Sequence, residues 1–293
     1  MEKFKDTNLI KENGSKAFFI MISLYVFSSI IASALLSLIK NELVNQIISL
    51  LVSPVSMAVV LIFYHKTAKA KAKEILGAKR FSPVYIFSAV LLSVAMFLGL
   101  GFINELIAKG LTILGLKASG VSLNIDRVYK VILYSILLAV LPAIVEETFF
   151  RGLILHSLRG AKIIPTVLTS ALVFALYHGS ATQLVYQFIF GCFLALLTIK
   201  SKSVIPAIIS HFINNFAIII LTYFKVAVNL FNSYLIALGL ICLFGFICIC
   251  VFYDKPSQVK FNGTVKGFYS IYFVFATCIC LIFIIGGLFS GKN

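Results

Sequence analysis

Residues 131–158, VILYSILLAVLPAIVEETFFRGLILHSL, form an apolar run that contains two adjacent carboxylates and an arginine. The run is long enough to cross a bilayer, since a membrane-spanning helix needs about 20 predominantly apolar residues. Ionisable groups are costly in hydrocarbon, so Glu146, Glu147 and Arg151 indicate a functional site rather than a lipid-facing surface. This stretch therefore predicts a helical membrane protein with chemistry inside its bundle.

The rest of the chain repeats this apolar character. Hydrophobic residues make up 61% of the 293 positions, whereas about 45–50% is usual for a soluble domain. We expect an all-α, polytopic membrane bundle of about eight to nine transmembrane helices. A polar stretch at 1–16 precedes the first run, which we expect to be a true span and not a signal peptide. The predicted spans are 17–39, 43–64, 82–107, 131–158, 163–178, 184–199, 203–224, 229–252 and 267–289.

The net charge of +15 follows the predicted membrane topology and does not indicate a nucleic-acid partner. If the N-terminus lies inside, 18 of the 25 Lys and Arg residues fall on the inner side, including the basic segment 66–80. Cytoplasmic loops are enriched in these residues, so the distribution predicts an inside N-terminus and, with nine spans, an outside C-terminus. We expect membrane lipid, and no nucleic acid, as the partner of this charge.

The motif Glu-Glu-x-x-x-Arg at 146–151 separates its two carboxylates in space. In a helix, Glu147 and Arg151 stand four residues apart and can pair on one face. Glu146 then points about 100° away and stays free for chemistry. Pro142 predicts a kink beside it, which could admit water. The alternative is a solvated charge cluster where the helix leaves the membrane.

Two later runs carry isolated polar residues. His178 ends the fifth run, and His211 and Asn215 stand one helical turn apart in the seventh. At 1.5 Å per residue, Glu146 and His178 lie about 21 and 24 Å from the hairpin at 160–162, hence at similar depth. His178 alone could instead satisfy a helix end, and His211 with Asn215 could simply form interhelical hydrogen bonds.

The motifs Glu-Glu-x-x-x-Arg, Phe-x-x-x-His and His-x-x-x-Asn, in this order on successive helices, resemble the CAAX-processing and bacteriocin-processing (CPBP) family of intramembrane endopeptidases, similar to type II CAAX prenyl proteases. The resemblance covers about 129–224 and implies a helical bundle with a polar intramembrane cavity. It divides the chain into a tail with three helices at 1–128, a catalytic core at 129–224 and C-terminal helices at 225–293.

The resemblance also implies roles for the motif residues. Glu146 would be the general base on water, with His178 helping to hold or activate that water. His211 and Asn215 would stabilise the oxyanion, and Glu147 with Arg151 would orient these groups. As a multi-pass protein of the cell membrane, the chain would cleave a peptide or a lipidated protein. The sequence makes no prediction of its oligomeric state.

A metal-dependent alternative stays open at this point. The family is often labelled a metalloprotease, and Glu146, His178 and His211 could supply three zinc ligands with water in the fourth position. The His-Glu-x-x-His helix of zinc peptidases is absent from the sequence. We favour glutamate activation without an obligatory metal.

Two other functions use the same residues. One is a non-proteolytic membrane partner, for immunity or regulation, that retains the protease fold. The other is a proton-coupled transporter, for which intramembrane Glu and His are also typical. A transporter predicts inverted repeats with broken helices, and the sequence shows neither, so this alternative ranks last.

Overall fold

The computed structural model describes residues 2–67, 81–116, 125–253 and 263–289. Over these residues the chain is helical and forms no β-strand, apart from one isolated bridge between Ala161 and Gly263. Eight of the described helices are long and apolar enough to cross a membrane, and a ninth, Ile163–Tyr177, is shorter. The predicted all-α, polytopic membrane bundle is therefore confirmed. The basic segment predicted at 66–80 lies almost entirely outside the described residues.

The helices follow the predicted apolar runs closely. They are α1 (Glu2–Leu36), α2 (Glu42–Thr67), α4 (Val84–Val94), α5 (Phe102–Ile113), α6 (Val128–Tyr134), α7 (Leu141–Glu147), α8 (Leu155–Ser157), α9 (Ile163–Tyr177), α10 (Leu184–Ser201), α11 (Ile205–Tyr223), α12 (Ser233–Cys248) and α13 (Ile271–Phe289). Wider π-helical turns η1 (Ala95–Gly99), η2 (Ser135–Val140), η3 (Thr148–Ile154) and η4 (Ile249–Tyr253) interrupt the longer ones, and η5 (Lys266–Phe268) is a 3₁₀ turn.

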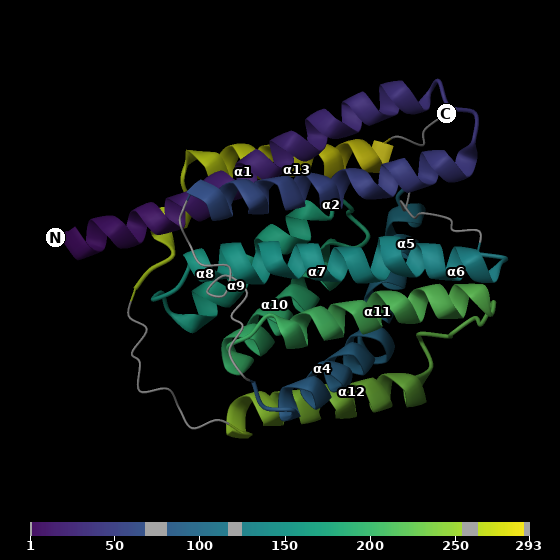
Figure 1. Ribbon diagram of the computed structural model, residues 1–293. Coiled ribbons are helices and arrows are strands. Elements are labelled where there is room, and N and C mark those ends of the chain that lie inside the picture. The colour runs from purple at the N-terminus through teal and green to yellow at the C-terminus, as the bar shows by residue number, and fades with distance from the viewer. Residues whose placement is uncertain (1, 68–80, 117–124, 254–262, 290–293) are drawn as a thin grey trace.

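The bundle is layered around two central helices (Figure 1). On one side, α1 packs against α2 and α13, and on the other α4 packs against α12. The span that contains α7 lies next to α11 between these layers. One hydrophobic core joins α1, α2 and α13 to the central span, and a second joins α4, α10 and α12. The central helices are thus covered by protein on both sides.

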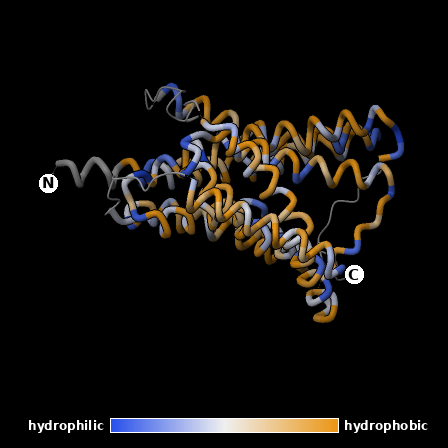
Figure 2. The backbone as a smooth tube through the Cα atoms, turned by 90° about the horizontal axis from the view of Figure 1, so that it is seen from below, coloured by the Kyte–Doolittle hydropathy of each residue, from blue (hydrophilic) through white to orange (hydrophobic). Residues whose placement is uncertain are grey.

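Apolar residues cover the outside of the bundle as well as its cores. Figure 2 shows hydrophobic residues along the helices and hydrophilic residues gathered at their connections. Large apolar side chains such as Phe27, Phe244 and Ile282 are more than 60% exposed. A contiguous exposed apolar surface of this kind marks a membrane-facing surface. The chain is therefore a multi-pass membrane protein.

The connections alternate between the two ends of the bundle. Those at 158–162 and 202–204 lie at one end, and those at 37–41 and 224–232 at the other (Figure 1). This is the alternation that the predicted topology requires. Which end faces the inside stays a prediction from the distribution of Lys and Arg.

The central span Val128–Ser157 alternates between α-helical and π-helical turns. The π segments η2 and η3 flank α7 on both sides. Single π turns inside helices change the direction of the following side chains and occur frequently at functional sites. Here they bracket the seven residues of α7 that carry Pro142, Glu146 and Glu147.

Close backbone contact positions α4 and α5 against α12. Gly99 in η1 lies directly against Gly239, and a Cβ atom on Gly239 would stand 2.2 Å from the Gly99 nitrogen. Small residues allow membrane helices to approach closely. The contact lies just before α5, which packs against α10.

Candidate active site

A cavity of about 480 Å³ lies between α5, α7, α10 and α11. The four residues predicted to be catalytic, Glu146, His178, His211 and Asn215, all line it. Glu146 lies in α7, and His178 directly follows the last residue of α9. His211 and Asn215 both lie in α11. The structure therefore brings together side chains that are up to 69 positions apart in the sequence. The roles that we assigned to them stay predictions.

Glu146 faces the cavity with one of its carboxylate oxygens unpaired. The Tyr177 hydroxyl donates to Oε1 at 3.4 Å, and the same hydroxyl bonds Ser53 of α2. Oε2 is buried and has no hydrogen-bond partner among the described residues. A buried polar atom without a partner is rare and calls for an explanation such as a bound water or a catalytic role. Glu146 thus has an oxygen available to accept a proton.

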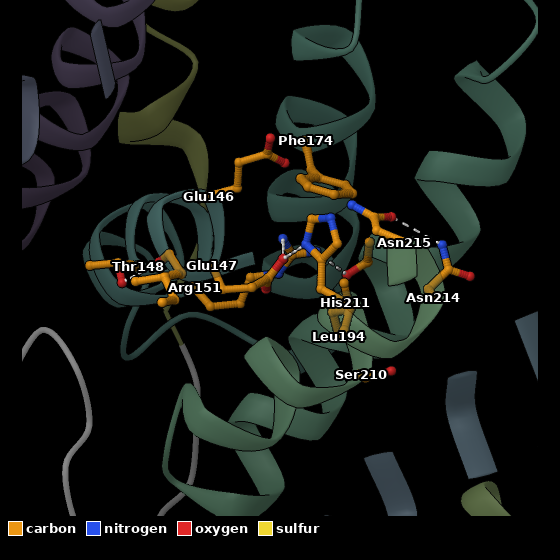
Figure 3. A network of polar contacts seen from close by, with 12 residues as sticks. Glu146, Glu147, Thr148, Arg151, Phe174, Leu194, Ser210, His211, Asn214 and Asn215 are labelled. Carbon is orange, nitrogen blue, oxygen red and sulfur yellow. Dashed lines mark hydrogen bonds and ion pairs between the residues drawn. The ribbon is translucent and has the colours of Figure 1, made fainter. Parts of the chain in front are cut away.

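Glu147 points in another direction and forms a buried ion-pair network. Its Oε1 accepts from Arg151 Nη1 at 3.0 Å and from His211 Nδ1 at 2.8 Å. The Glu147 and Arg151 side chains are fully buried. Figure 3 shows the Glu147 carboxylate between Arg151 and His211, with Glu146 directed away from them. The pair expected within one helix is present, and it extends to the neighbouring helix through His211.

Arg151 is held by more than its carboxylate partner. Nη2 donates to the carbonyl oxygen of Gly191 in α10 at 3.3 Å, and the guanidinium carbon lies 4.2 Å from the centre of the Phe174 ring. A Cβ atom on Gly191 would stand 3.0 Å from Ala171, so α9 and α10 pack closely here. Arg151 therefore ties α9 and α10 to the central span.

His178 has a defined arrangement of its ring proton. Nδ1 lies 2.8 Å from the backbone oxygen of Phe174, one helical turn earlier. A carbonyl oxygen can only accept, so Nδ1 carries the proton and Nε2 of the neutral ring is an acceptor. The side chain of His178 also packs edge-on against Phe174 and Tyr177. It is thereby fixed with Nε2 available to bind a water proton.

Asn215 connects α11 to the kinked part of the central span. Proline has no N–H, so Pro142 cannot donate to the carbonyl four residues earlier, that of Leu138. Asn215 Nδ2 donates to this Leu138 oxygen at 2.9 Å. The Asn215 oxygen in turn accepts from Asn214, whose own oxygen accepts from the Tyr186 hydroxyl at 2.9 Å. The Asn215 amide is therefore oriented at both ends, and one Nδ2 proton remains.

The zinc alternative does not fit this arrangement. Among the described residues, no three His, Cys, Asp or Glu side chains are placed to hold one metal ion. Glu146, His178 and His211 line one cavity but are not placed together as ligands of one ion. We therefore derive no catalytic step through a metal.

Several residues that line the cavity or contact Glu146 were not predicted from the sequence. Tyr177 and Asn214 are direct neighbours of the motif residues His178 and Asn215. Glu105 lines the cavity from α5. It is the only charged residue in the predicted span 82–107. An ionisable group inside an apolar run indicates function, so Glu105 was predictable on the same grounds as Glu146.

The comparison with known families agrees with the motifs. Residues 128–217 match the family model described as type II CAAX prenyl endopeptidase Rce1-like. This segment contains all seven motif residues, from Glu146 to Asn215. The chain matches no curated protein and no solved structure. Residues 128–217 are therefore similar to the Rce1-like type II CAAX prenyl endopeptidase family, which agrees with the family resemblance that the three motifs predicted.

Proposed function

We propose that this protein is an intramembrane endopeptidase of the cell membrane that hydrolyses a peptide bond in a lipidated, CAAX-like protein or peptide. The observation that carries the proposal is the single cavity of about 480 Å³ in which Glu146, His178, His211 and Asn215 meet. The family match supports a membrane peptidase in general. The residue roles rest on the contacts described above.

In the proposed reaction, Glu146 removes a proton from a water molecule in the cavity. The water oxygen attacks the carbonyl carbon of the scissile peptide bond and forms a tetrahedral intermediate. His178 Nε2 accepts a hydrogen bond from the same water and orients it. When the intermediate collapses, the C–N bond breaks and the leaving amine takes the proton from Glu146. General acid–base catalysis of this kind contributes about 100- to 10,000-fold to a rate.

His211 and Asn215 are the proposed donors to the oxyanion. Asn215 has one Nδ2 proton beyond the one that it gives to Leu138. His211 Nδ1 is bound by Glu147, so the ring presents Nε2 to the cavity. This role requires a proton on Nε2, and hence the imidazolium form, whose charge faces the Glu147 carboxylate. Preorganised donors of this kind act most strongly where water is excluded.

The test is cleavage by the purified protein in detergent. Farnesylated C-terminal peptides are incubated with the wild type, with Glu146→Gln and with Glu42→Gln, an exposed carboxylate of α2 that serves as the matched control. Mass spectrometry of the products locates the cleaved bond. We expect cleavage by the wild type and the control and none by Glu146→Gln.

Two outcomes would contradict the proposal. Equal cleavage by Glu146→Gln would exclude this residue as the base. Loss of cleavage with a chelator, restored by zinc, would contradict the metal-free mechanism. A folded protein that cleaves no peptide would instead favour a non-proteolytic membrane partner with the same fold.

A further inference from the structure

The cavity extends beyond the groups that the mechanism uses. Asn104 and Glu105 line it from α5, and Gln183 and Gln187 line it from the start of α10. Helices α5 and α10 pack against each other, so these side chains share one region of the cavity wall. None of the four has a role in the proposed hydrolysis, and together they form a second polar surface for a bound peptide.

This region of the cavity has a carboxylate and no Lys or Arg among the described residues. Two carboxylates, Glu105 and Glu146, line the cavity, and no Lys or Arg of the described residues does. Lys109 lies one turn after Glu105, but its Nζ is 4.1 Å from the centre of the Phe231 ring. Within the described ranges, Glu105 takes part in no ion pair. Its carboxylate therefore faces the cavity without a neutralising cation from the described protein.

Hydrogen-bond acceptors are also in excess there. The side-chain oxygen of Asn104 is buried and has no hydrogen-bond partner in the described part of the chain. Glu146 Oε2 is in the same situation. Unpaired buried acceptors are costly unless a donor satisfies them. A ligand group that brings both positive charge and several N–H donors, an ammonium or a guanidinium, would satisfy Asn104 and Glu105 together.

We propose that Glu105 and Asn104 form a specificity subsite that binds a Lys or Arg side chain of the peptide substrate. A peptide carboxylate placed in this region would face Glu105 with no described cation to balance it. The attraction between Glu105 and a Lys or Arg side chain is stronger than in water, because the cavity lies in a low-dielectric bundle. This subsite rests on the proposed function in so far as the ligand is a peptide substrate.

Binding measurements separate the subsite from catalysis. The Glu146→Gln protein in a neutral detergent is titrated with fluorescent farnesylated peptides that differ only in Lys, Gln or Glu at one position, scanned along the tail. We expect the Lys peptide to bind about tenfold more tightly than the Gln peptide at one position, the size expected for one charged hydrogen bond. The Glu peptide should bind more weakly than either, and added salt should reduce the difference.

Charge substitutions at position 105 then test the residue itself. In the Glu146→Gln protein, the additional substitution Glu105→Gln should abolish the preference for the Lys peptide. The additional substitution Glu105→Lys should reverse that preference in favour of the Glu peptide. Glu42→Gln, on an exposed end of α2, is the matched control and should leave the preference intact. A reversed preference in the Glu105→Lys variant cannot arise from a folding defect, since a defect would weaken the binding of all three peptides alike.

The outcomes distinguish this subsite from the proposed function. Equal binding of the three peptides, no binding of any, or a preference that persists in Glu105→Gln would overturn the subsite. If the wild type cleaves all three peptides at the same rate, the endopeptidase function stands and the subsite fails. If the Glu146→Gln protein discriminates between peptides that the wild type does not cleave, the subsite stands and the endopeptidase function fails.

Discussion

The cavity wall around Glu146 and the ion-pair network around Glu147 begin at neighbouring residues of α7 and are built in opposite ways. In both residues Oε2 is buried and has no partner among the described residues, but the Oε1 of Glu146 has only one weak donor, Tyr177. Glu147 has two strong donors on Oε1, Arg151 and His211, and does not line the cavity. One helical step of about 100° separates a carboxylate that lines the cavity from one that is held in a buried ion-pair network.

This difference shows how a membrane bundle can hold a reactive acid. The network around Glu147 neutralises its charge, fixes the His211 ring and joins α7 to α10 and α11. The cavity wall leaves Glu146 incompletely paired at a place where water can enter. We therefore expect substitutions on the cavity side to change the rate of cleavage, and substitutions on the network side to change stability as well.

The largest effect is expected on the cavity side. Glu146→Gln keeps the size of the side chain but removes the base, so peptide cleavage should fall by about 100- to 10,000-fold. Its melting temperature in detergent should stay close to that of the wild type, because Glu146 has few partners to lose. Cleavage rate and thermal unfolding are measured on the same sample. If Glu146→Gln lost its activity only because it unfolds, the cavity wall and the ion-pair network would no longer differ in the way that we expect.

On the network side, Glu147→Ala leaves Arg151 buried without its carboxylate. Breaking a buried pair by removing one partner costs about 3–5 kcal/mol of folding free energy. Glu147→Ala should therefore unfold at a clearly lower temperature or denaturant concentration, and its cleavage should fall because His211 is no longer oriented.

The double variant Glu147→Leu with Arg151→Leu sharpens this prediction. Replacing both partners of a buried pair by apolar residues is often neutral or stabilising. We expect the double variant to recover much of the lost stability but not the cleavage. Wild-type stability of the single Glu147→Ala variant would contradict the structural role of the network.

Asn215→Ala tests the point at which α11 meets the cavity wall. This variant removes the proposed oxyanion donor and also the donor to the Leu138 carbonyl. Loss of one oxyanion donor costs about 100- to 1,000-fold in kcat. We expect KM to change little, because the interaction forms in the transition state. A rise in KM at constant kcat would show that Asn215 binds the substrate instead.

The smallest effect is expected for Tyr177→Phe, which keeps the ring and removes the hydroxyl between Glu146 and Ser53. A single neutral hydrogen bond is worth about 1 kcal/mol net, so kcat should fall by about fivefold. Tyr129→Phe, at a residue that is 56% exposed, is the control. A loss as large as that of Glu146→Gln would mean that Tyr177 takes part in proton transfer itself.

Much of the fold was predictable because the membrane imposes simple rules. Each of the nine apolar runs corresponds to a helical region of the structure. Of the two shortest runs, 184–199 belongs to a helix long enough to span, whereas the helix of 163–178 is too short. The π turns and the Gly99–Gly239 contact were not predicted. They depend on how closely two particular helices approach, and hydropathy carries no information on that distance.

The sequence by itself determined the contacts that lie within one helix. Glu147 pairs with Arg151, and Glu146 diverges from Glu147, because the α-helical repeat places residues at known angles. The apolar surroundings of these residues also predict that they are functional, since isolated charges are costly in hydrocarbon.

Only the tertiary structure decided which helices these groups meet. It placed His211 on Glu147, Asn215 on the Leu138 carbonyl, to which Pro142 cannot donate, and Glu105 in the same cavity as Glu146. Such contacts depend on helix order, rotation and depth together. In lipid the apolar faces of different helices are nearly equivalent, so shape and a few polar contacts select the packing.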